Sequence, residues 1–160
     1  MGVSGCGKTY FGKKAAQILK CEFIDADNFH TQENIEKMRE GIALTDLDRK
    51  PWLEKIHGVL LKKYTEGSSA ILACSMLKNS HQKFLLSNLE AKIIYLEGSY
   101  AFIIKQLQQR QGHFFPPSLL KSQFDILQVP KSAITISIEQ SEEKTLTDMV
   151  KNLKNSRFGC

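Results

Sequence analysis

Apolar and polar residues follow two periods along this chain, and each period predicts one kind of element. Apolar side chains recur at helical spacing in seven segments: 8–19, 33–40, 48–66, 80–87, 100–111, 118–127 and 142–153. Short apolar runs of strand length occur in four others: 21–24, 70–74, 92–96 and 134–138. The run 70–74 is continuous, which is typical of a strand buried on both faces of a parallel sheet. Alternating strands and helices predict one α/β domain with a parallel sheet, spanning residues 1–160.

A glycine-rich turn immediately precedes the first predicted helix. Its eight residues follow the pattern G-x-x-x-x-G-K-[ST]: Gly2, Val3, Ser4, Gly5, Cys6, Gly7, Lys8 and Thr9. In a P-loop of this pattern the backbone N–H groups surround phosphates, and the helix start adds a favourable dipole. Lys8 would reach the β- and γ-phosphates of ATP, and the Thr9 hydroxyl would help to hold Mg²⁺. A chance glycine-rich turn is less favoured because a helical pattern follows at once.

The strand that normally leads into a P-loop has no counterpart in the sequence. Only Met1 precedes the loop, so we expect a three-layer P-loop kinase fold whose first, central strand is missing. Losing a central strand exposes unpaired backbone on its two neighbours. This feature supports an alternative hypothesis, in which the chain is an N-terminally truncated isoform that is not catalytic. Such a chain would fold poorly or bind a full-length subunit.

Charge and composition argue against several other classes of protein. The net charge is +5, but the 22 basic residues are spread along the chain without a run of five, which argues against nucleic-acid binding. The apolar runs are far too short to cross a membrane, and no leader-like segment precedes them. The four cysteines form no C-x-x-C pair and are typical of reduced thiols. Together these features predict a cytoplasmic protein without nucleic-acid or membrane partners.

Two carboxylates follow the predicted strand 21–24. Asp25 and Asp27 would lie at its carboxyl end, where open α/β sheets bind their ligands. Residues at i and i+2 of an extended segment point the same way, so one carboxylate could orient the Mg²⁺ shell while the other accepts a proton from a substrate hydroxyl. A helix cap or turn explains two Asp residues equally well on its own; the preceding P-loop favours the functional interpretation.

Further candidates lie at the starts of later helices. Arg49 offers the planar fork that suits a carboxylate substrate, although its segment is also a capped helix start. Ser75 and Lys78 follow the strand 70–74 and would face the same crevice; an ordinary turn with a solvated lysine has equal weight. Arg110 and His113 belong to a segment with a glycine and aromatics. That segment, about 110–127, could close over ATP as a lid, or be a helix end with aromatics packed down.

Taken together, these motifs resemble the gluconokinase family of P-loop small-molecule kinases, which is related to shikimate kinase. The resemblance covers most of residues 1–130. Its segments are 1–9, 23–30 (FIDADNFH), 34–41 (NIEKMREG), 44–53, 74–78, 95–96, 110–115, 119–120 and 122–124. The lid motif Gly112-His113-Phe114 and the block at Asp48-Arg49 separate this family from shikimate and adenylate kinases.

The resemblance implies a reaction and a set of roles. ATP would phosphorylate D-gluconate to 6-phospho-D-gluconate with Mg²⁺ in a cytosolic enzyme, often a homodimer, that feeds the pentose phosphate route. It implies Lys8, Asp27 and Arg110 as catalytic residues, and Asp25 as a partner of Mg²⁺ through water. It also implies that His30, Arg49, Ser75, Lys78 and His113 lie at the substrate. A kinase for another sugar acid or polyol is the nearest alternative among enzymes.

The sequence departs from the family at position 6, where many relatives have serine. A cysteine at a helix N-terminus predicts a thiol that oxidises readily and would then crowd the phosphate site.

Overall fold

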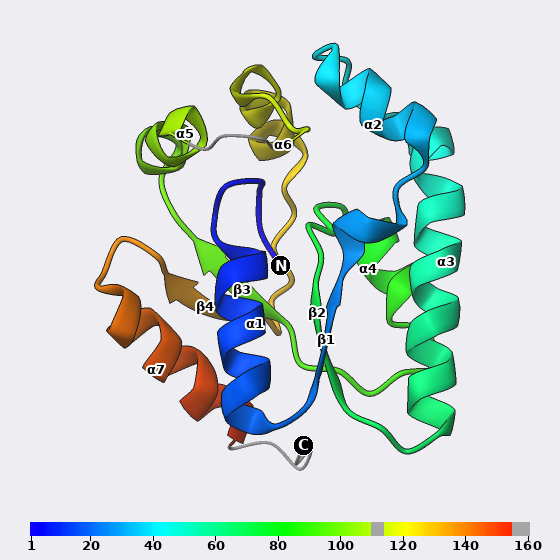
Figure 1. Cartoon of the computed structure of the whole chain (residues 1–160), viewed down its shortest axis with the longest axis vertical. Coiled ribbons are helices and arrows are strands. Elements are labelled where there is room, and N and C mark those ends of the chain that lie inside the picture. The colour runs from blue at the N-terminus through cyan, green and yellow to red at the C-terminus, as the bar shows by residue number, and fades with distance from the viewer. Residues whose placement is uncertain (110–113, 155–160) are drawn as a thin grey trace.

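The computed structural model describes residues 1–109 and 114–154 (Figure 1). Its strands are β1 (Glu22–Asp25), β2 (Ala70–Ala73), β3 (Ile94–Glu97) and β4 (Ile134–Ser137). Its α-helices are α1 (Lys8–Leu19), α2 (Gln32–Arg39), α3 (Asp46–Thr65), α4 (Asn79–Leu85), α5 (Tyr100–Gln109), α6 (Leu120–Ile126) and α7 (Glu142–Lys154). Two 3₁₀ helices, η1 (Ala26–Phe29) and η2 (Pro117–Leu119), complete the order. The predicted α/β alternation is confirmed, with boundaries shifted by at most a few residues.

The strands form two parallel pairs. β1 pairs with β2, with Phe23 opposite Ile71, and β3 pairs with β4, with Tyr95 opposite Thr135. Figure 1 shows the N-terminus between the two pairs. In the described residues no strand precedes α1, as expected. Met1 alone reaches the edge of β3, where the Leu96 N–H donates to its carbonyl at 3.0 Å.

The helix α3 begins two residues earlier than the pattern predicts, and its cap explains why. Thr45 Oγ1 accepts from the Asp48 N–H at 3.2 Å, and the Asp48 carboxylate accepts from the Thr45 N–H at 2.9 Å. This capping box satisfies two N–H groups that a helix start leaves without partners. Pro51 lies in the second turn of α3 and lacks the N–H that would otherwise donate to the Leu47 carbonyl. The cap fixes Arg49 in the first turn.

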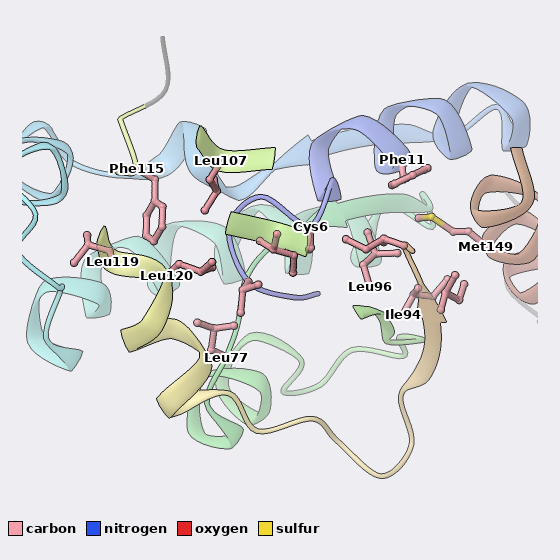
Figure 2. Close-up of a cluster of buried hydrophobic side chains, with 14 of the residues drawn as sticks. Cys6, Phe11, Leu77, Ile94, Leu96, Leu107, Phe115, Leu119, Leu120 and Met149 are labelled. Atoms are coloured by element: carbon pink, nitrogen blue, oxygen red, sulfur yellow. The ribbon is translucent and has the colours of Figure 1, made fainter. Parts of the chain in front are cut away.

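A hydrophobic cluster lies directly beneath the glycine-rich loop (Figure 2). It joins the loop to α1, α5, α6, α7 and both strands of the β3–β4 pair. Cys6 points into it with no exposed surface. The expectation of a readily oxidised Cys6 is therefore wrong for the folded chain, because peroxide cannot reach a fully buried thiol. Packing of the Cys6 side chain into the core therefore has a larger effect on its reactivity than its position near a helix N-terminus.

A second cluster surrounds Trp52 and Ile56 of α3 and anchors η1. The Trp52 indole N–H donates to the Ala26 carbonyl at 2.7 Å in the interior. This bond holds the segment after β1 against α3, and so places Asp27 and His30 beside Arg49. No helix within residues 1–109 and 114–154 has the length and apolar character that a membrane crossing needs.

Candidate active site

The glycine-rich loop has the backbone geometry of a phosphate cradle. Gly2, Gly5 and Gly7 all have positive φ, and Gly7 ends the loop directly before α1. A Cβ on Gly5 would stand 2.7 Å from Leu107 Cγ, so both conformation and space require glycine there. Gly7, the N-cap residue of α1, has no side chain with which to cap the N–H groups that follow it. Open N–H groups and the positive end of a helix dipole favour an anion at this point.

Lys8 and Thr9, at the start of α1, bond to the phosphate loop and to β1. Lys8 Nζ donates to the Val3 carbonyl at 2.9 Å, which holds the ammonium group along the loop. Thr9 Oγ1 donates to Asp25 Oδ2 at 2.8 Å. The other Asp25 oxygen accepts from the Asp27 N–H at 3.1 Å. Asp25 therefore connects the start of α1 to the end of β1.

The pair Thr9 and Asp25 suits Mg²⁺. Hydroxyl and carboxylate oxygens are hard ligands, and Mg²⁺ is usually held by one or two such groups together with phosphates and water. Among the described residues no group of three or more His, Cys, Asp or Glu side chains could hold a metal alone. The donor set thus fits an ion that arrives with a nucleotide better than a resident all-protein metal site.

Five predicted residues meet in one pocket next to the loop. Ser4, Asp27, His30, Arg49 and Ser75 all line it, although they come from four separate parts of the chain. Its volume is about 60 Å³, well below the several hundred Å³ of typical small-molecule sites. The structure therefore represents a closed or contracted form of this pocket.

His30 has one polar atom without a partner. Its ring lies parallel to Trp52, with centroids 4.6 Å apart. Within the part of the chain that is described, its buried Nδ1 has no hydrogen-bond partner. Burial lowers the pKa of His30, against a smaller opposite effect of the Asp27 carboxylate. A neutral imidazole with an unmatched nitrogen in a pocket is suited to a ligand hydroxyl, which can donate or accept.

Lys78 does not line this pocket, but it bonds to Asp46, which in turn contacts two residues that do. Its ammonium donates to both Asp46 oxygens at 2.8 Å. The same carboxylate lies 3.3 Å from His81 Nε2 and 3.6 Å from Arg49 Nη1. Both Arg49 and His81 line the pocket. Burial lowers the pKa of His81, and the nearby Arg49 charge lowers it further.

Sequence reasoning missed Asp46, His81 and Gln123. Asp46 belongs to the predicted cap region, and His81 lies inside a short helix. Neither residue therefore stands in a sequence motif that would indicate a functional role. Gln123 of α6 accepts from the Ser4 N–H at 2.6 Å and donates to Ser4 Oγ at 3.2 Å. An amide side chain from the predicted lid thus contacts the phosphate loop directly.

The described part of the predicted lid covers the pocket. Phe114, Phe115 and Leu119 line it, and the Phe114 ring meets His30 edge-on, with centroids 6.1 Å apart. Phe115 is buried and Phe114 is half-buried, so these aromatic residues pack down, as the second interpretation of this segment expects. Arg110 and His113 lie outside the described residues.

A phosphate loop at a helix start, a Thr9–Asp25 pair and an adjacent polar pocket under a lid define a P-loop kinase. The shikimate kinase family model matches residues 4–154. A sugar kinase from Janibacter sp. HTCC2649 superposes with a TM-score of 0.87 at 35% identity, covering 96% of this chain and 91% of that one. The kinase fold and the phosphotransferase class are thereby confirmed.

More specific relatives are gluconokinases. That of Arabidopsis thaliana is 40% identical over 97% of this chain and 92% of its own length. A gluconokinase structure from Sinorhizobium meliloti 1021 superposes with a TM-score of 0.80 at 32% identity, covering 99% of this chain and 95% of that one. The chain belongs to the gluconokinase family.

Proposed function

We propose that this chain transfers the γ-phosphoryl group of ATP to D-gluconate and forms 6-phospho-D-gluconate. The observation that carries the proposal is the shared pocket of Ser4, Asp27, His30, Arg49 and Ser75. It combines a phosphate-loop residue, a carboxylate that can receive a proton, and a cation for the substrate carboxylate. A polyhydroxy acid needs all three kinds of partner.

In this proposal the glycine-rich loop binds the phosphates of ATP. The N–H groups at the start of α1 would receive the β- and γ-phosphates, and Lys8 would leave the Val3 carbonyl to meet them. Thr9 and Asp25 would hold Mg²⁺, with Asp25 acting through water. When bound, the ion neutralises charge on the phosphate oxygens. Arg110 is proposed to add charge from the lid.

In this proposal Asp27 accepts the proton of the substrate hydroxyl group. The primary hydroxyl oxygen of gluconate forms a bond to the γ-phosphorus as the bond to the bridging oxygen of ADP breaks. The hydroxyl proton passes to the Asp27 carboxylate. Asp27 is positioned for this role because its backbone N–H is held by Asp25 and its segment by Trp52. Phosphoryl transfer depends mainly on such positioning and on charge neutralisation.

The carboxylate end is proposed to be recognised by Arg49 and Lys78. Both cations already pair with the Asp46 carboxylate, which supports the proposal that they recognise a carboxylate group. Planar guanidinium groups bind carboxylates through two parallel hydrogen bonds. His30 Nδ1 and Ser75 would bind hydroxyl groups along the sugar chain, with His113 supplied by the lid.

Substrate entry requires the pocket to enlarge. Its 60 Å³ volume accommodates no six-carbon acid, so Phe114 and Phe115 must move outward before binding. Gln123 would then release the Ser4 N–H group, which becomes free for phosphate. Lid opening and closing of this kind also excludes water from the transfer step.

Three further features belong to the proposal: Mg²⁺ dependence, a cytoplasmic location and a homodimeric state. The Thr9–Asp25 oxygens support the first. The free thiols of Cys6 and Cys74 suit a reducing compartment. The product would feed carbohydrate metabolism through the pentose phosphate route.

A panel of acceptors tests the proposal. ADP release is measured with D-gluconate, shikimate, other sugar acids and polyols, using monodisperse protein and Lys8→Ala as the blank. The proposal predicts that gluconate gives the highest kcat/KM. A higher value for another acid would reassign the substrate within kinases. No turnover by well-folded protein would support the non-catalytic alternative, which is not favoured because the similarity to gluconokinases extends over nearly the whole chain.

A further inference from the structure

The chain turns sharply at Met76, between the strand β2 and the helix α4. Met76 has a φ of +29°, a backbone conformation that residues other than glycine rarely adopt. The other non-glycine residues described with positive φ, Lys20 and Asn88, are exposed, whereas Met76 is buried. Strain of this kind persists only where surrounding contacts enforce it, and it is concentrated at functional sites.

This turn shapes one wall of the substrate pocket. Ser75, Met76 and Leu77 all line the pocket, although neighbouring side chains of an extended segment point to opposite sides. The left-handed residue between Ser75 and Leu77 accounts for this arrangement. The Leu77 side chain is fixed in the hydrophobic cluster that also contains Leu120 of α6 (Figure 2). The conformation at Met76 therefore determines where Ser75 can meet a substrate hydroxyl.

Gln82 of α4 holds the turn from the interior. Its buried side-chain amide donates to the Met76 carbonyl at 3.0 Å and to the Gln128 carbonyl at 2.7 Å. One NH₂ group thus satisfies two carbonyls that lie far apart in the sequence. Removing this donor would leave both carbonyls without it, and an unsatisfied buried polar group is costly.

Gln128, two residues after α6, holds the same turn through its backbone and its side chain. Its N–H donates to the Leu77 carbonyl at 2.7 Å, and its side-chain oxygen accepts from the Asn79 N–H at 2.7 Å. Lys78, the N-cap residue of α4, makes no side-chain bond of this kind, so Gln128 supplies the cap that the helix start needs. The chain that follows the predicted lid is thereby fixed to the segment that precedes α4.

We propose that Gln82 and Gln128 are positioning residues for the acceptor. Neither is among the described residues that line the pocket, so they act through the backbone that they hold. By fixing that backbone they place the Ser75 hydroxyl and the Lys78 ammonium group for gluconate, and in this respect the inference rests on the function proposed above. The phosphate loop is bonded by Gln123 instead, so ATP binding should not depend on the pair.

Matched glutamine variants separate positioning from stability. Gln82→Met keeps the side-chain length and removes both donated bonds. Gln128→Met removes the acceptor for the Asn79 N–H, whereas Gln128→Glu keeps an oxygen there. Gln140→Met is the control, because Gln140 donates to Asp148 of α7 at 3.0 Å. Initial rates at varied gluconate and ATP are combined with amide exchange at Asn79, measured without substrates.

The KM for gluconate should rise about tenfold in Gln82→Met and about threefold in Gln128→Met, because buried polar groups lose their partners. The KM for ATP should stay near the wild-type value in both. Gln128→Glu and Gln140→Met should match wild type in both constants. The Asn79 amide should exchange about tenfold faster in Gln128→Met than in Gln128→Glu.

A lower kcat or melting temperature with an unchanged KM for gluconate would assign the glutamines a merely structural role and overturn the proposal. Equal KM values in the two Gln128 variants would do the same. Gln128 is exposed, so its variants decide the question if Gln82→Met does not fold. Wild-type protein that does not turn over gluconate would contradict the proposed function and this inference together, whereas active wild type with unaffected variants would overturn this inference alone.

Discussion

Lys78 Nζ lies 2.8 Å from each carboxylate oxygen of Asp46 and so ties the N-terminus of α4 to the first turn of α3. The hydrogen bond from Lys78 is the main reason that the pKa of Asp46 lies below its usual value. Arg49 and His81 converge on the same carboxylate. The protein therefore already assembles cationic groups around a carboxylate, as binding of a sugar acid requires.

Replacing Lys78 tests its role in substrate recognition. Lys78→Met should raise the KM for gluconate at least tenfold and leave the KM for ATP nearly unchanged, because the Lys78 ammonium bonds to Asp46 of α3 and not to the phosphate loop. The fold should survive, since exposed ion pairs contribute only about 0–1 kcal/mol. Initial rates at varied gluconate and ATP give both constants. Lys144→Met is the matched control, because Lys144 pairs with Asp148 on α7, away from the site. Equal KM values in the two variants would remove Lys78 from the substrate site.

Asp27→Asn tests proton acceptance. The substitution preserves shape but not basicity, so kcat should fall by about 10²–10⁴ with little change in gluconate binding. Single-turnover experiments measure the rate of phosphoryl transfer, and calorimetry separately measures the affinity for gluconate. Asp148→Asn on α7 serves as control and should retain wild-type turnover. A fall of less than threefold in the Asp27 variant would contradict its assignment.

Two glycine substitutions should have opposite effects on stability. Gly5→Ala places a Cβ against Leu107 at a φ of +87°, so we expect a loss of about 1–3 kcal/mol and weakened ATP binding. Gly58→Ala on α3 meets nothing within 4 Å, so helix propensity should make it stabilising by about 0.5–1 kcal/mol. Urea unfolding measures both, and a Gly5 variant as stable as wild type would refute the described loop geometry.

Stability should depend on pH through His30. Burial lowers its pKa, so below the ordinary value of about 6.5 the unfolded chain binds more protons than the folded one. The His30 contribution is therefore fully present above pH 6.5 and is lost as the pH falls toward the folded-state pKa. His30→Phe keeps a ring against Trp52 but cannot titrate. Urea midpoints between pH 5 and 8 should fall less steeply on the acid side for this variant. Parallel curves would contradict the prediction.

Local patterns predicted most of the fold because they depend on neighbours in sequence. The P-loop glycines, the strand lengths and the α1 boundaries all follow from periodicity and turn chemistry. The apolar pattern starts α3 two residues late, because the Thr45–Asp48 capping box that begins the helix is made by polar residues. The burial of Cys6 is not predictable from the sequence, because it depends on α5 packing against the loop.

The candidate site was predicted less completely, for a related reason. Asp27, His30, Arg49 and Ser75 were expected near one another because strand ends and helix starts meet at one sheet edge. Asp46, His81 and Gln123 join them only through tertiary contacts between α3, α4 and α6. No spacing along the chain records such contacts. Arg110 and His113 remain predictions.

The most direct test of the central claim is identification of the product. Protein is incubated with ATP, Mg²⁺ and D-gluconate, and the mixture is followed by phosphorus–proton correlation NMR. The account predicts a phosphate ester coupled to the C6 methylene protons of gluconate, formed in equal amount to ADP and absent with Lys8→Ala. ADP accompanied only by inorganic phosphate, or an ester at another carbon, would contradict it.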